Sequence, residues 1–78
     1  MEPIEVTARF DISGEIHPLS FVWQGRKYPL ASSGRRWQDK DGLHILVMAP
    51  PERVFELIYM SQEGRWFIKP LTNPGRVV

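Results

Sequence analysis

The 78-residue sequence contains no cysteine and only two histidines, His17 and His44. The absence of cysteine excludes disulfides, thiolate nucleophiles and zinc sites built on cysteine. With two histidines, any metal site would have to depend on carboxylates. We therefore predict neither a metal site nor a bound cofactor.

Long apolar runs are also absent, and no stretch approaches the roughly 20 apolar residues of a membrane-spanning helix. The first ten residues, MEPIEVTARF, carry acidic side chains where a signal peptide has a basic segment and an apolar run. We expect a soluble, cytoplasmic protein that does not contact membranes. The length predicts one small domain over residues 1–78, in which residues 70–78 form a loose tail because TNPGRVV is rich in turn formers.

Catalytic motifs are missing too: there is no glycine-rich phosphate loop, no paired metal-ligand spacing and no nucleophile elbow. The DKDG segment that contains Asp39 and Asp41 is better explained as a hairpin turn than as an acid pair. Glu56 lies among apolar residues, where burial could raise its pKa, but an ion pair with Lys69 is the simpler account. We predict no enzymatic activity and no small-molecule substrate.

The sequence does contain regularly spaced turn signals. Between them lie short segments in which apolar and polar residues alternate. IEVTARFDI places Ile4, Val6, Ala8, Phe10 and Ile12 on one face of a strand, as expected for a sheet with one wet side. LHILVMA is apolar on both faces. The pattern predicts an all-β antiparallel meander of about six short strands, closed as a small barrel or a two-layer sheet. The turn signals are Ser13-Gly14, Gln24-Gly25, Ser33-Gly34, Asp41-Gly42, Pro50-Pro51 and Glu63-Gly64.

The segment FVWQGRKYPL, residues 21–30, predicts a hairpin around a two-residue Gln24-Gly25 turn. In this register Phe21 faces Tyr28 and Trp23 faces Arg26, and Leu19 faces Leu30 on the same side. Pro29 has no N–H to donate, so its strand should lie at a sheet edge.

VFELIYM and RWFIKPL predict a second hairpin around SQEG. A four-residue loop pairs Tyr59 with Trp66, Leu57 with Ile68 and Glu56 with Lys69. A three-residue loop with Gly64 in a bulge would shift this register by one residue, and the sequence leaves both open.

Positive charge is concentrated in residues 26–40, which hold five basic residues against one acid, although the chain's net charge is only +1. Such a segment can bind phosphates, with an aromatic ring as a stacking platform. In a regular strand Arg36 and Lys40 would share one face, whereas Arg35 and Trp37 would share the other, which splits the cluster. We expect Trp23, Tyr28 and Trp66 in the core. The candidate nucleic-acid-binding residues are Arg26, Lys27, Arg35, Arg36, Trp37 and Lys40.

The sequence resembles an uncharacterised family of small bacterial β domains with a Phe-x-Trp-x-Gly-Arg-x-Tyr-x-Val pattern, a later Trp, Val-(Tyr/Phe)-(Asp/Glu)-Leu and a final Trp. The resemblance covers about residues 19–70, with Leu30 in place of the valine. Some members look like tail segments of proteins related to Y-family DNA polymerases, which implies a DNA-repair context. The matching residues are Phe21, Trp23, Gly25, Arg26, Tyr28, Trp37, Val54, Phe55, Glu56, Leu57 and Trp66.

Together these features predict a non-enzymatic module that presents a surface to another protein or to a second copy of itself as a homodimer. In the homodimer, strand 4–12 or the edge at Pro29 would be covered by the other chain. The alternative is a nucleic-acid-binding module that uses the basic residues of segment 26–40.

Overall fold

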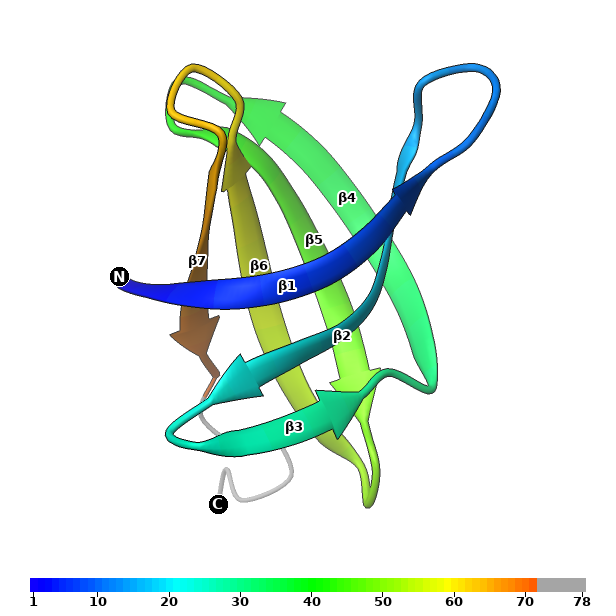
Figure 1. Cartoon of the computed structure of the whole chain (residues 1–78), viewed down its shortest axis with the longest axis vertical. Coiled ribbons are helices and arrows are strands. Elements are labelled where there is room, and N and C mark those ends of the chain that lie inside the picture. The colour runs from blue at the N-terminus through cyan, green and yellow to red at the C-terminus, as the bar shows by residue number, and fades with distance from the viewer. Residues whose placement is uncertain (72–78) are drawn as a thin grey trace, which may run out of the picture.

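The computed structural model describes residues 1–71, which form a single seven-stranded antiparallel sheet that curls into a half-barrel (Figure 1). The sheet order is β3-β2-β1-β7-β6-β5-β4, so β3 and β4 are its two edge strands. None of the described residues belongs to a helix long and apolar enough to span a bilayer. The strands are β1 (Glu2–Phe10), β2 (Ile16–Trp23), β3 (Arg26–Pro29), β4 (Ser32–Asp39), β5 (Gly42–Ala49), β6 (Arg53–Met60) and β7 (Arg65–Pro70).

The core lies between the two ends of the curled sheet, where β1–β3 pass across β5 and β6 (Figure 1). The Phe21 ring on β2 stacks on Tyr28 of β3 at 5.0 Å and meets Phe55 of β6 edge-on at 5.1 Å. Ile45 and Leu57 are fully buried beneath these rings. Aromatic side chains supply large buried area at low conformational cost, which suits so small a core.

The first predicted hairpin is confirmed, with Phe21 opposite Tyr28 and Trp23 opposite Arg26. Gln24 and Gly25 both have positive φ, at 53° and 77°, which is the backbone of a tight two-residue turn whose twist matches the flanking strands. Pro29 lies on the edge strand β3, as its missing donor requires.

The second predicted hairpin is also confirmed, and the structure selects the four-residue loop. Tyr59 faces Trp66, Leu57 faces Ile68 and Glu56 faces Lys69. Of the three aromatic residues expected in the core, Tyr28 is buried, whereas Trp23 and Trp66 are half-buried and pack against the core.

Three apolar side chains that alternation had placed on the buried face are exposed instead. Thr7 pairs with Ser20 but Ala8 pairs with Pro18, so Leu19 is the extra residue of a bulge and is 47% exposed. Phe10 ends β1 and Ile12 lies in the β1–β2 connection, which projects beyond the rest of the sheet (Figure 1), and these two residues are 61% and 106% exposed. The alternation of apolar and polar residues predicts burial only where a strand is regular and lies over the core. Here a bulge interrupts the pairing, and the end of β1 extends beyond the core.

Segment 33–34 is not a turn. The turn after β3 comes earlier, and Ser33 already pairs with Val47 of β5 within β4. The register then shifts, because Arg36 pairs with Ile45, so Gly34 and Arg35 together face Leu46 as a bulge. The predicted antiparallel meander of about six strands is confirmed, with seven strands in the structure.

Strand β1 is an interior strand, because it pairs with β2 on one side and with β7 on the other. Its pairing with β7 covers only Glu2–Ile4. The edge strands of the sheet are β3 and β4, and residues 5–10 of β1 have no paired strand on the β7 side within the described part of the chain. The predicted loose tail, residues 70–78, lies outside the described residues except for Pro70, which ends β7, and Leu71.

Candidate interaction surface

The face of β4–β6 that points away from the core carries an apolar strip. On β5 and β6 the odd-numbered side chains face the core, where Val47 and Phe55 are buried. The even-numbered neighbours point outward, where Leu46 and Val54 are half-buried and Met48 is 38% exposed. An apolar strip on the solvent side of a sheet is the kind of feature that marks an interaction surface.

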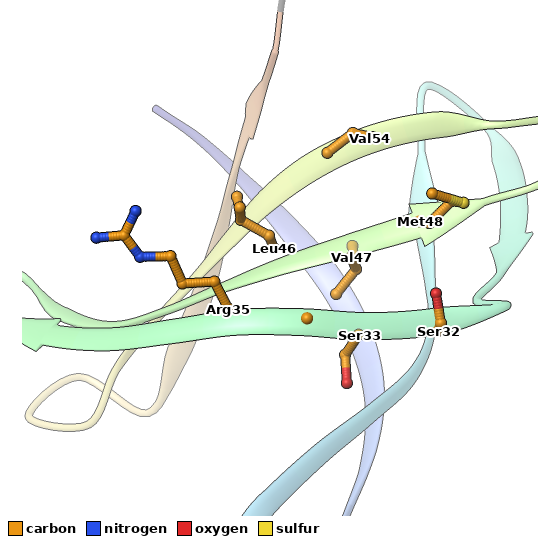
Figure 2. A pocket seen from close by; sticks show the side chains of 8 residues that line it. Ser32, Ser33, Arg35, Leu46, Val47, Met48 and Val54 are labelled. Carbon is orange, nitrogen blue, oxygen red and sulfur yellow. The ribbon is translucent and has the colours of Figure 1, made fainter.

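A shallow groove of about 180 Å³ lies in this strip beside the edge strand, and we call it the β4 groove (Figure 2). Leu46 forms its base, with Met48 and Val54 beside it and Arg35 at one end. The groove exists because the bulge places Gly34, which has no side chain, next to Leu46. A Cβ added at Gly34 would meet nothing within 4 Å, so the space above it is open.

Arg35 closes one end of the β4 groove. Its guanidinium lies 5.0 Å from the centre of the Trp37 ring, and Figure 2 shows its side chain extending away from Met48. Among the salt bridges of residues 1–71, none involves Arg35. The groove therefore combines an apolar base with a cation that has no carboxylate partner within the described part of the chain.

Beyond Trp37, an ion cluster centred on the buried His44 links β4, β5 and β6. His44 Nδ1 lies 2.6 Å from Glu56 Oε2, and His44 Nε2 lies 2.9 Å from Asp39 Oδ1. His44 faces Ile58 across the strand pair, so Glu56 is its diagonal neighbour, still within reach of a long side chain. The expected Glu56–Lys69 ion pair is thus replaced by Glu56–His44.

The two carboxylates set the protonation of His44. A neutral imidazole has one N–H, so its other nitrogen would face carboxylate lone pairs, whereas the imidazolium donates to both Glu56 and Asp39. Burial alone lowers the pKa of His44, but the hydrogen bonds to Glu56 and Asp39 outweigh it and raise that pKa above 6.5. The hydrogen bond from His44 also lowers the pKa of Asp39.

The hydrogen bonds of this cluster hold β4, β5 and the turn between them together. Both ring nitrogens of His44 are engaged by carboxylates. Asp39 Oδ1 also accepts hydrogen bonds from the backbone N–H groups of Asp41 and Gly42, which closes the predicted DKDG turn. Asp39, Asp41 and His44 lie close enough to share a cation, but His44 Nε2 and Asp39 Oδ1 are already hydrogen-bonded to each other.

A second carboxylate cluster shapes the projecting β1–β2 connection. Asp11 Oδ1 accepts hydrogen bonds from the backbone N–H groups of Ser13 and Glu15 and from the Ser13 hydroxyl. Asp11 Oδ2 lies 2.9 Å from His17 Nε2. These hydrogen bonds, that of the Ser13 hydroxyl foremost, hold the pKa of Asp11 well below its usual range. His17 is thus part of a loop-stabilising network.

The structure separates the candidate nucleic-acid-binding residues. Arg26 and Lys27 are exposed on β3, whereas Arg35 lies on β4 at the other end of the sheet order. Arg36 turns toward β2, where its Nη1 donates to the Ile16 carbonyl at 3.0 Å and lies 3.4 Å from the Glu15 carboxylate. Lys40 is exposed in the turn after β4.

Trp37 is half-buried, and its ring is covered by two neighbours. His44 stacks on it at 5.0 Å with an interplanar angle of 11°, and Arg35 lies over the ring as well. Both contacts occupy π surface that a stacked nucleobase would use. The β4 groove itself was not predicted, because it arises from the unforeseen bulge at Gly34.

Comparison with protein-family models, with curated proteins and with solved structures found no match. The resemblance to the uncharacterised family of small bacterial β domains therefore stays a prediction.

Proposed function

We propose that this chain is a non-enzymatic interaction module that binds an extended segment of another protein along strand β4. The observation that carries this proposal is the apolar β4 groove directly beside a free sheet edge. An extended peptide that joins a sheet edge gains main-chain hydrogen bonds, and pockets for its alternate side chains provide specificity.

The size of the β4 groove supports a protein partner over a small molecule. Pockets for small ligands and cofactors usually enclose about 300–1,000 Å³ and bury most of the ligand. The β4 groove has about 180 Å³ and is open to solvent along one side. It therefore has room for one or two aliphatic side chains of a partner.

The two sheet edges differ in a way that favours β4. Strand β3 has four residues and contains Pro29, which cannot donate a hydrogen bond to an added strand. Strand β4 has eight residues and no proline. An unpaired edge of that length presents a row of main-chain donors and acceptors.

The test begins with selection of binders from a phage-displayed library of random octapeptides, followed by amide hydrogen exchange on the protein with a selected peptide. We expect amides of residues 32–39 to gain protection and those of 26–29 to remain unchanged. Gly34→Val fills the open space of the groove, where a Cβ meets nothing within 4 Å, and should weaken binding, whereas Lys27→Val, the same side chain placed on β3, should not. Protection elsewhere, or no selected binder, would refute the proposal.

Nucleic acid is the second candidate ligand, favoured by one observation. Arg35, Trp37 and Lys40 lie on one stretch of exposed edge strand and turn, where a single strand could contact both charge and ring. We rank this candidate second because Arg36 is engaged with β2 and the Trp37 ring is already covered.

A further inference from the structure

We infer, on the basis of the proposed function, that the partner segment carries an acidic residue two positions before an aliphatic residue and runs antiparallel to β4. The aliphatic side chain fills the β4 groove, and the carboxylate pairs with Arg35. This assigns a chemical class to the partner: an extended, acidic–aliphatic peptide.

The aliphatic residue follows from the shape of the β4 groove. A strand added to the free edge of β4 places its side chains beside those of β4, and normally a β4 side chain would block the way to β5. At Gly34 there is no such side chain, and nothing occupies the space within 4 Å of where its Cβ would be. A branched aliphatic side chain can therefore cross β4 at this point and contact Leu46 and Met48.

The acidic residue follows from charge complementarity. Arg35 is exposed at the end of the β4 groove and makes no salt bridge with any of residues 1–71. Its guanidinium is already placed over Trp37, which limits the positions it samples. A planar guanidinium held in this way suits the two oxygens of a carboxylate.

The order and spacing follow from strand geometry. The Arg35 side chain extends toward the end of β4, and the open part of the groove lies toward its start (Figure 2). All neighbours in this sheet are antiparallel, and antiparallel pairing is the more stable form. Followed from its N-terminus, an antiparallel partner therefore passes Arg35 first and Gly34 second. Because alternate residues of a strand share a face, the acidic residue comes two positions before the aliphatic one.

A second copy of this chain is a poorer occupant. If two β4 strands paired antiparallel over their full length of residues 32–39, the Arg35-Arg36 pair of one copy would lie beside the same pair of the other. Like charges directly opposite each other destabilise a strand pair. The basic centre of β4 thus favours an acidic partner over itself.

The experiment measures fluorescence anisotropy of the full chain with four fluorescein-labelled peptides in a constant threonine background. Their central triplets are Glu-Thr-Ile, Lys-Thr-Ile, Glu-Thr-Ser and Ile-Thr-Glu. We expect the Glu-Thr-Ile peptide to bind at least about tenfold more tightly than the other three. Arg35→Glu should reverse the charge preference, so that the Lys-Thr-Ile peptide becomes the better ligand, and Gly34→Val should remove the preference for isoleucine over serine.

The outcomes separate this inference from the proposed function. Peptides that protect residues 32–39 from exchange but show no preference for an acid, or no reversal in Arg35→Glu, overturn the inference alone. If neither these peptides nor library-selected ones bind β4, both fail. A wild-type dimer in sedimentation that Gly34→Val dissociates identifies a second copy as the occupant and overturns the inference. Amide spectra of each variant that match the wild type establish that it is folded.

Discussion

The imidazole of His44 on β5 lies parallel to the indole of Trp37 on β4, with ring centroids 5.0 Å apart. The same imidazole is held from both sides by carboxylates, Glu56 at 2.6 Å and Asp39 at 2.9 Å. The buried His44 ring therefore connects β4, β5 and β6. It lies on the outer face of the sheet, at the other end from the open part of the β4 groove. Its charge should affect how firmly the edge strand β4 is held.

We predict that stability decreases as pH rises above about 6.5. The pKa of His44 is raised in the folded protein, so its stabilising charge is fully present below the unfolded value of 6.5 and is lost as pH passes the higher folded value. Urea unfolding monitored by tryptophan fluorescence should show a free energy of unfolding that falls through this range. Because the pKa of Asp39 is lowered, stability should also fall in acid, below about 3.8.

The variant Glu56→Gln separates this effect from general alkaline destabilisation. It keeps the size of the side chain but removes the charge that holds the His44 proton, so the slope above pH 6.5 should flatten. At pH 6 the free energy of unfolding of the variant should be about 1–3 kcal/mol lower than that of the wild type, which is the usual cost of weakening a buried charged hydrogen bond. A pH slope equal to that of the wild type would show that the cluster does not govern this titration.

We predict that Phe21→Ala lowers the free energy of unfolding by about 3–5 kcal/mol, because it leaves a cavity beside the Tyr28 and Phe55 rings. That loss is a large part of the stability of so small a domain. The matched control is Val22→Ala on the same strand, whose side chain is 37% exposed on the other face and should change stability by under about 1 kcal/mol. Equal effects of the two variants would contradict the core described above.

We predict that Arg36→Ala destabilises the fold by about 1.5–3 kcal/mol, whereas its neighbour Arg35→Ala changes stability by under about 0.5 kcal/mol. Arg36 joins β4 to β2 through the Ile16 carbonyl, and hydrogen bonds with a charged partner have this magnitude. Arg35 contacts only the exposed side of Trp37. Chemical denaturation of both variants checks the difference, which should disappear if Arg36 is a surface ligand contact instead.

The nucleic-acid alternative predicts a strong salt dependence. Labelled single-stranded DNA or RNA titrated at about 50 mM and about 200 mM salt should bind much more tightly at the lower concentration if phosphates are neutralised. We expect no such binding, because the cations do not gather on one face. Binding that is lost in the Arg36→Ala and Lys40→Ala double variant would restore this alternative, provided that the variant remains folded.

Both hairpins could be predicted from the sequence, but only the first with its register. The parity of Phe21 and Tyr28 about their turn selects one pairing, and Gly25 supplies the backbone that this turn requires. For the second hairpin the sequence left two registers open, and the structure shows the one that pairs Tyr59 with Trp66. These are local relationships within about ten residues. Side-chain alternation and turn chemistry act at that range, so no knowledge of the remaining chain was needed.

The candidate site was not predictable in the same way. Ser33-Gly34 has the composition of a turn, and only pairing with β5 makes it a bulge that opens the β4 groove. The exposure of Leu19 likewise depends on a register shift opposite Thr7 in β1. A bulge is a property of two strands, so neither strand's own pattern reveals it.

The sequence by itself determined the all-β class, every predicted turn except Ser33-Gly34, the first hairpin with its register and the existence of the second hairpin, because these depend on short-range backbone and pairing preferences. Tertiary structure alone decided that β1 closes onto β7, that Glu56 meets His44 rather than Lys69, and that Arg36 leaves the basic cluster for β2. The curl of the sheet decides which strands come close together. A long side chain such as Glu56 or Arg36 then contacts one of several neighbours within its reach. Local patterns carry no information on either choice.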